Sequence, residues 1–153
     1  MYKFFIYQYP EQLKVGQDFR ISFDVRSRNP SGTLFYVVGK EDFLKITIEN
    51  VKDDGSIKVT CNNGGGLFSV AYKPEPSICN GDIYSVLVEK KLKTLKLTVN
   101  GAVTEETTTK SSTSADTNSP AYFGGLPGMF ESSFNAFSER SIPSYCYPFQ
   151  NKK

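Results

Sequence analysis

Hydrophobic and polar residues alternate with a period of two along much of the chain. Residues 19–26, FRISFDVR, place Phe, Ile, Phe and Val at every second position and polar residues between them. This period is typical of a β-strand that buries one face of its sheet. Further strands are predicted at residues 33–39, 43–50, 56–61, 67–72, 83–88, 95–99 and 121–123.

Short turn sequences separate these strands. They include NPSG at residues 29–32, KDDG at residues 52–55 and Asn100-Gly101, and Asp-Gly and Asn-Gly pairs favour tight hairpins. No stretch of about 12 residues shows helical periodicity, although residues 128–140 could hold a short helical turn. Roughly ten short strands with frequent turns predict an all-β fold, an antiparallel β-sandwich of the jelly-roll type.

Size and charge limit the classes of function. The 153 residues fit one domain, residues 1–153. The net charge of +2 does not favour nucleic acid, which needs a concentrated basic surface. No apolar run is long enough for membrane insertion, and the N-terminal residues lack the features of a signal peptide. The chain is therefore expected to be cytosolic, or a module of a larger secreted protein.

Residues 104–119, TEETTTKSSTSADTNS, contain no large apolar side chain. In isolation this composition is typical of a flexible linker. Because strands are predicted on both sides, we interpret it as a long loop at one end of the sandwich, where functional residues tend to collect. Asp116 is the only carboxylate between Ser112 and Phe130.

Several motifs together resemble a known family. The succession FRISFDVR, GTLFYVV and EDFL, followed by CNNGGGLFSVAY, ICNGD, LKLTVNG and TSADTNSPAYFGGLP, is similar to laminin G-like domains, most of all to the C-terminal G modules of laminin alpha chains. The resemblance covers nearly the whole chain. It implies a concanavalin A-like sandwich that is secreted to the extracellular matrix (basement membrane). It also implies binding to glycosylated cell-surface receptors of the dystroglycan or integrin type and to heparan sulfate or other sulfated glycans.

The resemblance also implies one Ca²⁺ site. In the family, an aspartate before a strand and a second one in a later loop share the ion, and here these positions are Asp42 and Asp116. Backbone carbonyls near Val59 and Ser114 are expected to contribute by the same resemblance. A Ca²⁺ ion takes about six to eight oxygens, and few formal charges imply a Kd on the order of 10⁻⁴ to 10⁻³ M.

Each aspartate also has a purely structural interpretation. Asp42 could begin a strand and Asp116 could form an Asx-turn before Thr117. The neighbouring Asp53-Asp54 pair resembles a metal site, but in a DDG hairpin such residues more often serve the turn.

The basic segment EKKLKTLK is the candidate glycan-binding site. Lys90, Lys91, Lys93 and Lys96 cluster around one strand connection, and a sulfated glycan is a polyanion that such a cluster can hold. The alternative is a solvated lysine-rich hairpin that protects a sheet edge.

The chain departs from the family pattern at two places. Ile83-Tyr84 stands where many relatives have a Trp-His pair, and residues 130–153 are atypical, with Tyr145 before Cys146 in place of the family's glycine. The downstream cysteine that pairs with this position in the family is missing, so either the C-terminal segment is truncated or Cys146 pairs with another cysteine, such as Cys79. Cys61 is expected to be a small core residue.

An enzyme is not expected. With no histidine in the chain, Ser-His and Cys-His catalysis is excluded, and no strand carries the paired carboxylates that glycoside hydrolysis needs. A calcium-bearing binding module is therefore predicted. A structural spacer without ligands is the main alternative, and a sandwich-fold glycoside hydrolase is a weaker one.

Overall fold

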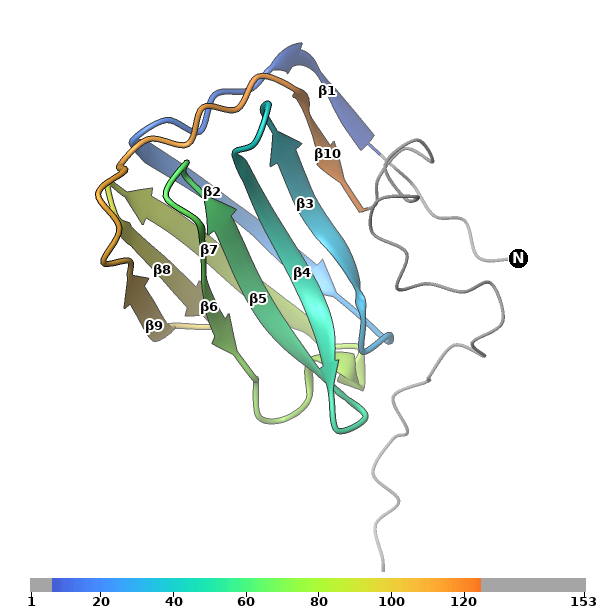
Figure 1. Ribbon diagram of the computed structural model, residues 1–153. Coiled ribbons are helices and arrows are strands. Elements are labelled where there is room, and N and C mark those ends of the chain that lie inside the picture. The colour runs from blue at the N-terminus through green and yellow to red at the C-terminus, as the bar shows by residue number, and fades with distance from the viewer. Residues whose placement is uncertain (1–6, 125–153) are drawn as a thin grey trace, which may run out of the picture.

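The computed structural model describes residues 7–124, which form ten β-strands and one short 3-10 helix (Figure 1). In chain order these are β1 (Tyr7–Gln12), β2 (Asp18–Arg26), β3 (Gly32–Val38), β4 (Phe43–Val51), β5 (Asp54–Asn62), β6 (Leu67–Tyr72), η1 (Ile78–Asn80), β7 (Ile83–Lys91), β8 (Thr94–Val99), β9 (Ala102–Thr107) and β10 (Pro120–Phe123). In these residues no helix is long and apolar enough to cross a membrane.

The strands form two antiparallel sheets that face each other. One sheet has six strands in the order β1-β10-β3-β4-β5-β6, and the other has four in the order β2-β7-β8-β9. The predicted all-β antiparallel sandwich is therefore confirmed. The predicted helical turn at residues 128–140 and the atypical segment 130–153 lie outside the described residues.

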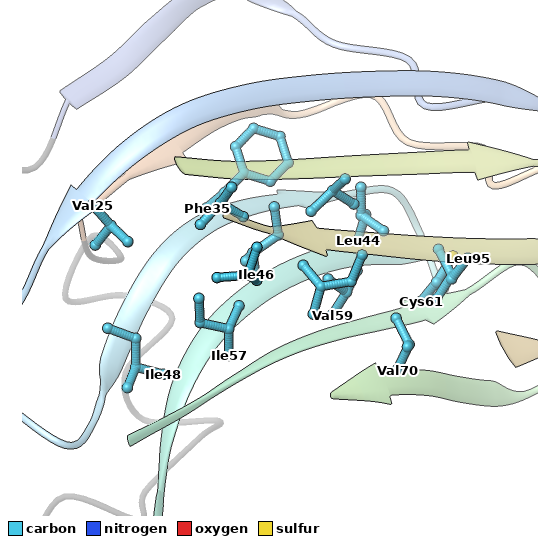
Figure 2. Packing of buried hydrophobic residues seen from close by; sticks show 14 of the residues in the cluster. Val25, Phe35, Leu44, Ile46, Ile48, Ile57, Val59, Cys61, Val70 and Leu95 are labelled. Atoms are coloured by element: carbon cyan, nitrogen blue, oxygen red, sulfur yellow. The ribbon is translucent and has the colours of Figure 1, made fainter. Parts of the chain in front are cut away.

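The core lies between the sheets and comes from the alternation seen in the sequence. Side chains of both sheets interdigitate there (Figure 2). Phe35 is fully buried, and its ring centroid lies 5.9 Å from that of Phe19 and 5.2 Å from that of Phe123. One aromatic side chain thus bridges both sheets, because Phe19 belongs to β2 and Phe123 to β10.

Tyr84 and Cys61 are both buried in the core. Tyr84 is buried and donates its hydroxyl to the carbonyls of Pro76 (2.9 Å) and Ser77 (3.0 Å), whereas Ile83 is 54% exposed. Tyr84 is therefore the core residue of the Ile83-Tyr84 pair. Cys61 is fully buried with a free thiol, as expected of a core residue.

The turn between β4 and β5 is shorter than the predicted turn at residues 52–55, because Val51 and Asp54 already pair with each other. Lys52 and Asp53 have φ values of 54° and 63° and form the turn, while Gly55 is already in β5. A Cβ on Gly55 would lie 2.5 Å from Cγ2 of Ile78, so this glycine allows η1 to pack closely. The Asp54 carboxylate accepts hydrogen bonds from Ser77 Oγ and from the backbone N–H of Gly55, and it lies 3.3 Å from Lys73 Nζ. These contacts support the structural interpretation of the Asp53-Asp54 pair.

Every second connection of the chain lies at the same end of the sandwich. We call this end the rim. It consists of the connections at residues 13–17, 39–42, 63–66, 92–93 and 108–119, which join β1 to β2, β3 to β4, β5 to β6, β7 to β8 and β9 to β10 (Figure 1). The rim holds both aspartates of the predicted calcium site.

Candidate metal-binding rim and basic cleft

The polar segment 104–119 is only partly a loop. Residues 104–107 belong to β9, which pairs with β8 through the Asn100-Gly101 turn. The later residues of the segment are fastened to the rest of the rim. Ala115 and Gly16 exchange two backbone hydrogen bonds of 3.0 and 2.9 Å, and Asn118 N and Ser119 N donate to Val38 O. The composition suggested a flexible linker, but backbone pairing holds this segment in place.

Asp42 and Asp116 meet at the rim through one direct hydrogen bond. The backbone N–H of Asp116 donates to Oδ2 of Asp42 at 2.7 Å, and the Asp42 side chain is largely buried. The Asp116 carboxylate is 73% exposed, accepts a hydrogen bond from Ser114 Oγ at 3.0 Å and lies 3.9 Å from Lys14 Nζ. The structure therefore brings together three of the predicted ligand residues, Asp42, Ser114 and Asp116.

Gly39 makes this approach sterically possible. A Cβ at Gly39 would lie 3.0 Å from the carbonyl carbon of Asp116 and 3.2 Å from Cα of Thr117, and closer still to Asp116 O. Residue 39 is also bridged to Thr117 in an isolated antiparallel pair. The end of β3 and the aspartate-bearing loop can touch only because residue 39 has no side chain.

The connection between β5 and β6 forms a further wall of the rim. A Cβ at Gly64 would lie 3.6 Å from Asp42 Oδ1 and 3.5 Å from Ser112 Oγ. Asn63 Nδ2 donates to Ser112 O at 2.8 Å, and Ser112 Oγ donates to Asn63 O. Asn63 Oδ1 is buried with no hydrogen-bond partner among residues 7–124. Sequence reasoning treated NNGGG only as a tight connection and missed Asn63.

The donor chemistry of the rim fits a hard cation. Carboxylate oxygens of Asp42 and Asp116, neighbouring carbonyls and the oxygen of Asn63 are the ligand types that Ca²⁺ prefers. No group of three or more carboxylate, cysteine or histidine side chains exists in the part of the chain that the structure describes. An ion at the rim would therefore depend on two carboxylates and on neutral oxygens.

Val59 is not brought to this group. It is fully buried in the middle of β5, opposite Ile46 of β4 and Val70 of β6. Ile46 is four residues along β4 from Asp42, a separation of about 13 Å at the strand rise of about 3.3 Å. Near Asp42, the paired register instead places Asn62 opposite Phe43. Hairpin lengths between these two strands vary within the family, which explains why the resemblance pointed to Val59 rather than to a residue near Asn62.

The predicted lysine cluster is divided between two faces of the four-stranded sheet. The prediction that Lys90 is a surface residue is wrong. The strand was expected to end at Val88, but β7 continues to Lys91. Tyr84, Val86, Val88 and Lys90 therefore all point inward, and Lys90 is 1% exposed. Its Nζ lies within hydrogen-bonding distance of four backbone carbonyls. Burial lowers the pKa of this ammonium, which Asp18 and Asp42 partly oppose.

The other three lysines line one cleft of about 610 Å³ on the outer face of the four-stranded sheet. Its lining residues are Glu89, Lys91, Leu92, Lys93, Thr94, Lys96, Glu105, Thr107 and Thr113. Lys96 lies 3.7 Å from Glu89 and pairs in register with Glu105. Lys91 and Lys93 have no salt bridge within residues 7–124, so they carry the available positive charge of the cleft.

Comparison with known proteins gives the family of this sandwich. The sequence profile described as Laminin G domain matches residues 25–145. The chain belongs to the laminin G domain family. The module is 32% identical to mouse (Mus musculus) laminin subunit alpha-1 over 135 residues, which are 86% of this chain and 4% of that protein. It is 29% identical to mouse laminin subunit alpha-4 over 120 residues, 76% of this chain and 6% of that protein. The laminin G module thus spans a small part of each relative.

Solved structures agree with this family. The structure of the mouse laminin alpha1 chain, domains LG4-5, has a TM-score of 0.69 and 31% sequence identity, covering 78% of this chain and 31% of that chain. A Bacillus licheniformis beta-glucanase has a TM-score of 0.50 and 13% identity, covering 80% of this chain and 58% of that chain. At that identity only the sandwich fold is shared. The family membership confirms the predicted non-enzymatic module.

Proposed function

We propose that this laminin G module is an extracellular matrix binding domain whose rim holds one Ca²⁺ ion and engages glycosylated cell-surface receptors. The observation that carries the proposal is the junction at the rim, where the Asp116 loop is hydrogen-bonded to the Asp42 carboxylate. Asp42 and Asp116 would hold the ion, and the carbonyl of Ser114 would add a neutral oxygen. The bound ion would supply a positive centre on the rim for anionic groups of a receptor glycan.

A calcium titration by isothermal calorimetry tests the metal site. The wild-type module should bind with a Kd on the order of 10⁻⁴ to 10⁻³ M, as expected for an extracellular site with two formal charges. Asp116→Asn should weaken binding at least about tenfold, because it removes one of the two charges. Asp53→Asn makes the same change in a remote turn and should bind like wild type. Equal titration curves for wild type and Asp116→Asn would refute the site.

Receptor binding separates a binding module from a structural spacer. A solid-phase overlay of the module on a heavily glycosylated receptor of the dystroglycan type should give a signal that EDTA removes. A signal that is absent, or equal with and without EDTA, would favour the spacer or an integrin-type contact that does not depend on the rim.

The cleft on the four-stranded sheet supports a second, salt-sensitive contact with heparan sulfate or another sulfated glycan. Lys91 and Lys93 would carry it, since Lys96 is flanked by Glu89 and Glu105 and exposed lysines hold polyanions through screened contacts. Replacing both Lys91 and Lys93 by alanine should lower the salt concentration that elutes the module from heparin-agarose. A Lys45→Ala, Lys58→Ala double variant on the opposite sheet is the matched control. Equal elution of all three proteins would contradict the proposal.

Secretion into the basement membrane would match the compartment of the laminin relatives, and it would allow Cys79 to form a disulfide, since disulfides persist in oxidising compartments. Cys61 is a buried free thiol and would not take part. Peptide mapping of the secreted protein under non-reducing conditions should find Cys79 in a disulfide. Recovery of Cys79 as a free thiol would argue against this compartment.

A further inference from the structure

Lys90 is an unusual residue at the end of β7, directly beside the rim. It follows Tyr84, Val86 and Val88 on the inward face of β7, and its side chain is almost completely buried. A charged lysine is rarely fully buried unless it is paired. Among residues 7–124 no carboxylate forms a salt bridge with Lys90.

The partners of the Lys90 ammonium are backbone carbonyls. Its Nζ lies 2.9 Å from the carbonyl oxygens of Gly16, Leu92 and Thr113, and 3.3 Å from that of Gln17. An ammonium has three protons, so the three short contacts use all of them. Four carbonyl dipoles around one cation form a small oxygen cage of the kind that also suits a free monovalent cation.

The cage joins three connections that are far apart in the sequence. Gly16 and Gln17 lie between β1 and β2, Leu92 lies between β7 and β8, and Thr113 lies between β9 and β10. Without the ammonium, the carbonyls of Leu92 and Thr113 would lose their donor, which costs free energy, whereas those of Gly16 and Gln17 would keep only the backbone N–H groups of Ala115 and Leu92. The charge of Lys90 therefore opposes separation of the three connections.

Thr113 stands directly before the part of the loop that carries the proposed calcium ligands. Its neighbour Ser112 exchanges hydrogen bonds with Asn63, and two residues later Ala115 pairs with Gly16. The cage and the Ala115–Gly16 pair thus fasten the same loop to the same turn. A shift of Thr113 must move Ser114 and Asp116 with it.

The geometry points to Lys90 as a positioning residue, a tethered cation whose ammonium orders the rim loop in the conformation that presents Asp116 beside Asp42. Removal of the ammonium leaves a site for a small primary ammonium ion with three N–H donors. The consequence for calcium rests on the proposed function, whereas the ordering of the loop does not.

Hydrogen–deuterium exchange in EDTA tests the ordering without calcium. Lys90→Met keeps a long apolar side chain and removes the charge, and Lys90→Ala also leaves room for a ligand. The amides of Ala115 and Asp116 should exchange at least about tenfold faster in both variants, because their hydrogen bonds belong to the released loop. Lys58→Met on β5 is the control and should leave both amides as in wild type.

Chemical rescue separates the ammonium from simple packing. Propylammonium contains the atoms that Lys90→Ala lacks, from Cγ to Nζ, and should slow exchange at Ala115 and Asp116 in a saturable way. Tetramethylammonium has the same charge and no N–H donor, so it should not. If Lys90→Ala does not fold under these conditions, a higher midpoint of thermal unfolding in propylammonium than in tetramethylammonium is the equivalent result.

Three outcomes would overturn the inference: wild-type exchange in both Lys90 variants, equal effects of the two cations, and no effect of either. Calcium binding distinguishes this failure from failure of the proposed function. If wild type binds no calcium but the rescue succeeds, only the calcium proposal fails. If wild type and Lys90→Met bind calcium equally well and exchange equally slowly, only the role of Lys90 fails.

Discussion

A methyl group at Gly39 should disrupt the rim more than any exposed substitution near it. In Gly39→Ala, the new Cβ would lie 3.0 Å from the Asp116 carbonyl carbon and 3.2 Å from Thr117 Cα, and inside contact distance of Asp116 O. All three atoms belong to the backbone, so no side chain can rotate away. The loop has to move as a unit.

The cost can be built from the contacts that the movement breaks. Inserting a methyl group into a packed site costs about 1–3 kcal/mol. Displacing the loop also strains the 2.7 Å bond from Asp116 N to the Asp42 carboxylate, and a hydrogen bond to a charged group contributes about 1.5–3 kcal/mol. Since these terms overlap, we expect Gly39→Ala to lower the free energy of unfolding by about 2–4 kcal/mol.

Urea unfolding followed by circular dichroism measures this change, and calorimetry measures calcium binding on the same samples. Gly32→Ala in β3 is the matched control, because a Cβ there meets no atom within 4 Å. The control should be neutral or gain up to about 1 kcal/mol through its less flexible unfolded state. Unchanged stability of Gly39→Ala relative to wild type would show that the loop does not lie against β3 as described.

Three further predictions concern the core. Tyr84→Phe should lower the free energy of unfolding by about 1–2 kcal/mol, because it leaves the Pro76 and Ser77 carbonyls without their hydroxyl donor; equal urea midpoints would contradict this. Burial raises the pKa of the Cys61 thiol from 9.0 to about 12, so between these values only the unfolded chain ionises and stability should fall as pH rises. Cys61→Ala should make that fall smaller, with the remainder due to Tyr36 and Tyr84, whose pKa values burial also raises. Native Cys61 should resist Ellman's reagent at pH 8; rapid native reaction would refute its burial. Leu97→Ala should cost about 2–5 kcal/mol in urea unfolding, and a loss under 1 kcal/mol would contradict its placement in the core.

The period-two pattern was enough to predict the sandwich, because inward and outward positions differ sharply in hydrophobicity. The segment LFSVAY is one example, since it was predicted as a strand and is β6 with the same bounds. The pattern failed where a charged residue points inward. Lys90 continues the inward series of β7, but its charge suggested a turn, and only the carbonyl cage explains why it is tolerated.

The sequence predicted only part of the candidate site. Asp42, Ser114 and Asp116 were identified through the family motif, and the structure brings them together at the rim. Val59 was placed through the same resemblance although hairpin lengths vary within the family, and the register of β4 and β5 puts it in the middle of the sheet. Asn63 and Gly39 carry no chemical signal in the sequence, because their roles depend on contacts between connections that are distant along the chain.

The pairing of β1 with β10 decides how the module can be attached to other parts of a protein. Tyr7 is opposite Phe123, and both residues lie at the strand ends that point away from the rim, since β1 runs into the rim and β10 runs out of it (Figure 1). The first residue of β1 and the last residue of β10 therefore lie side by side, away from the rim. Among the described residues, the rim and the two ends of the chain therefore lie on different sides of the sandwich.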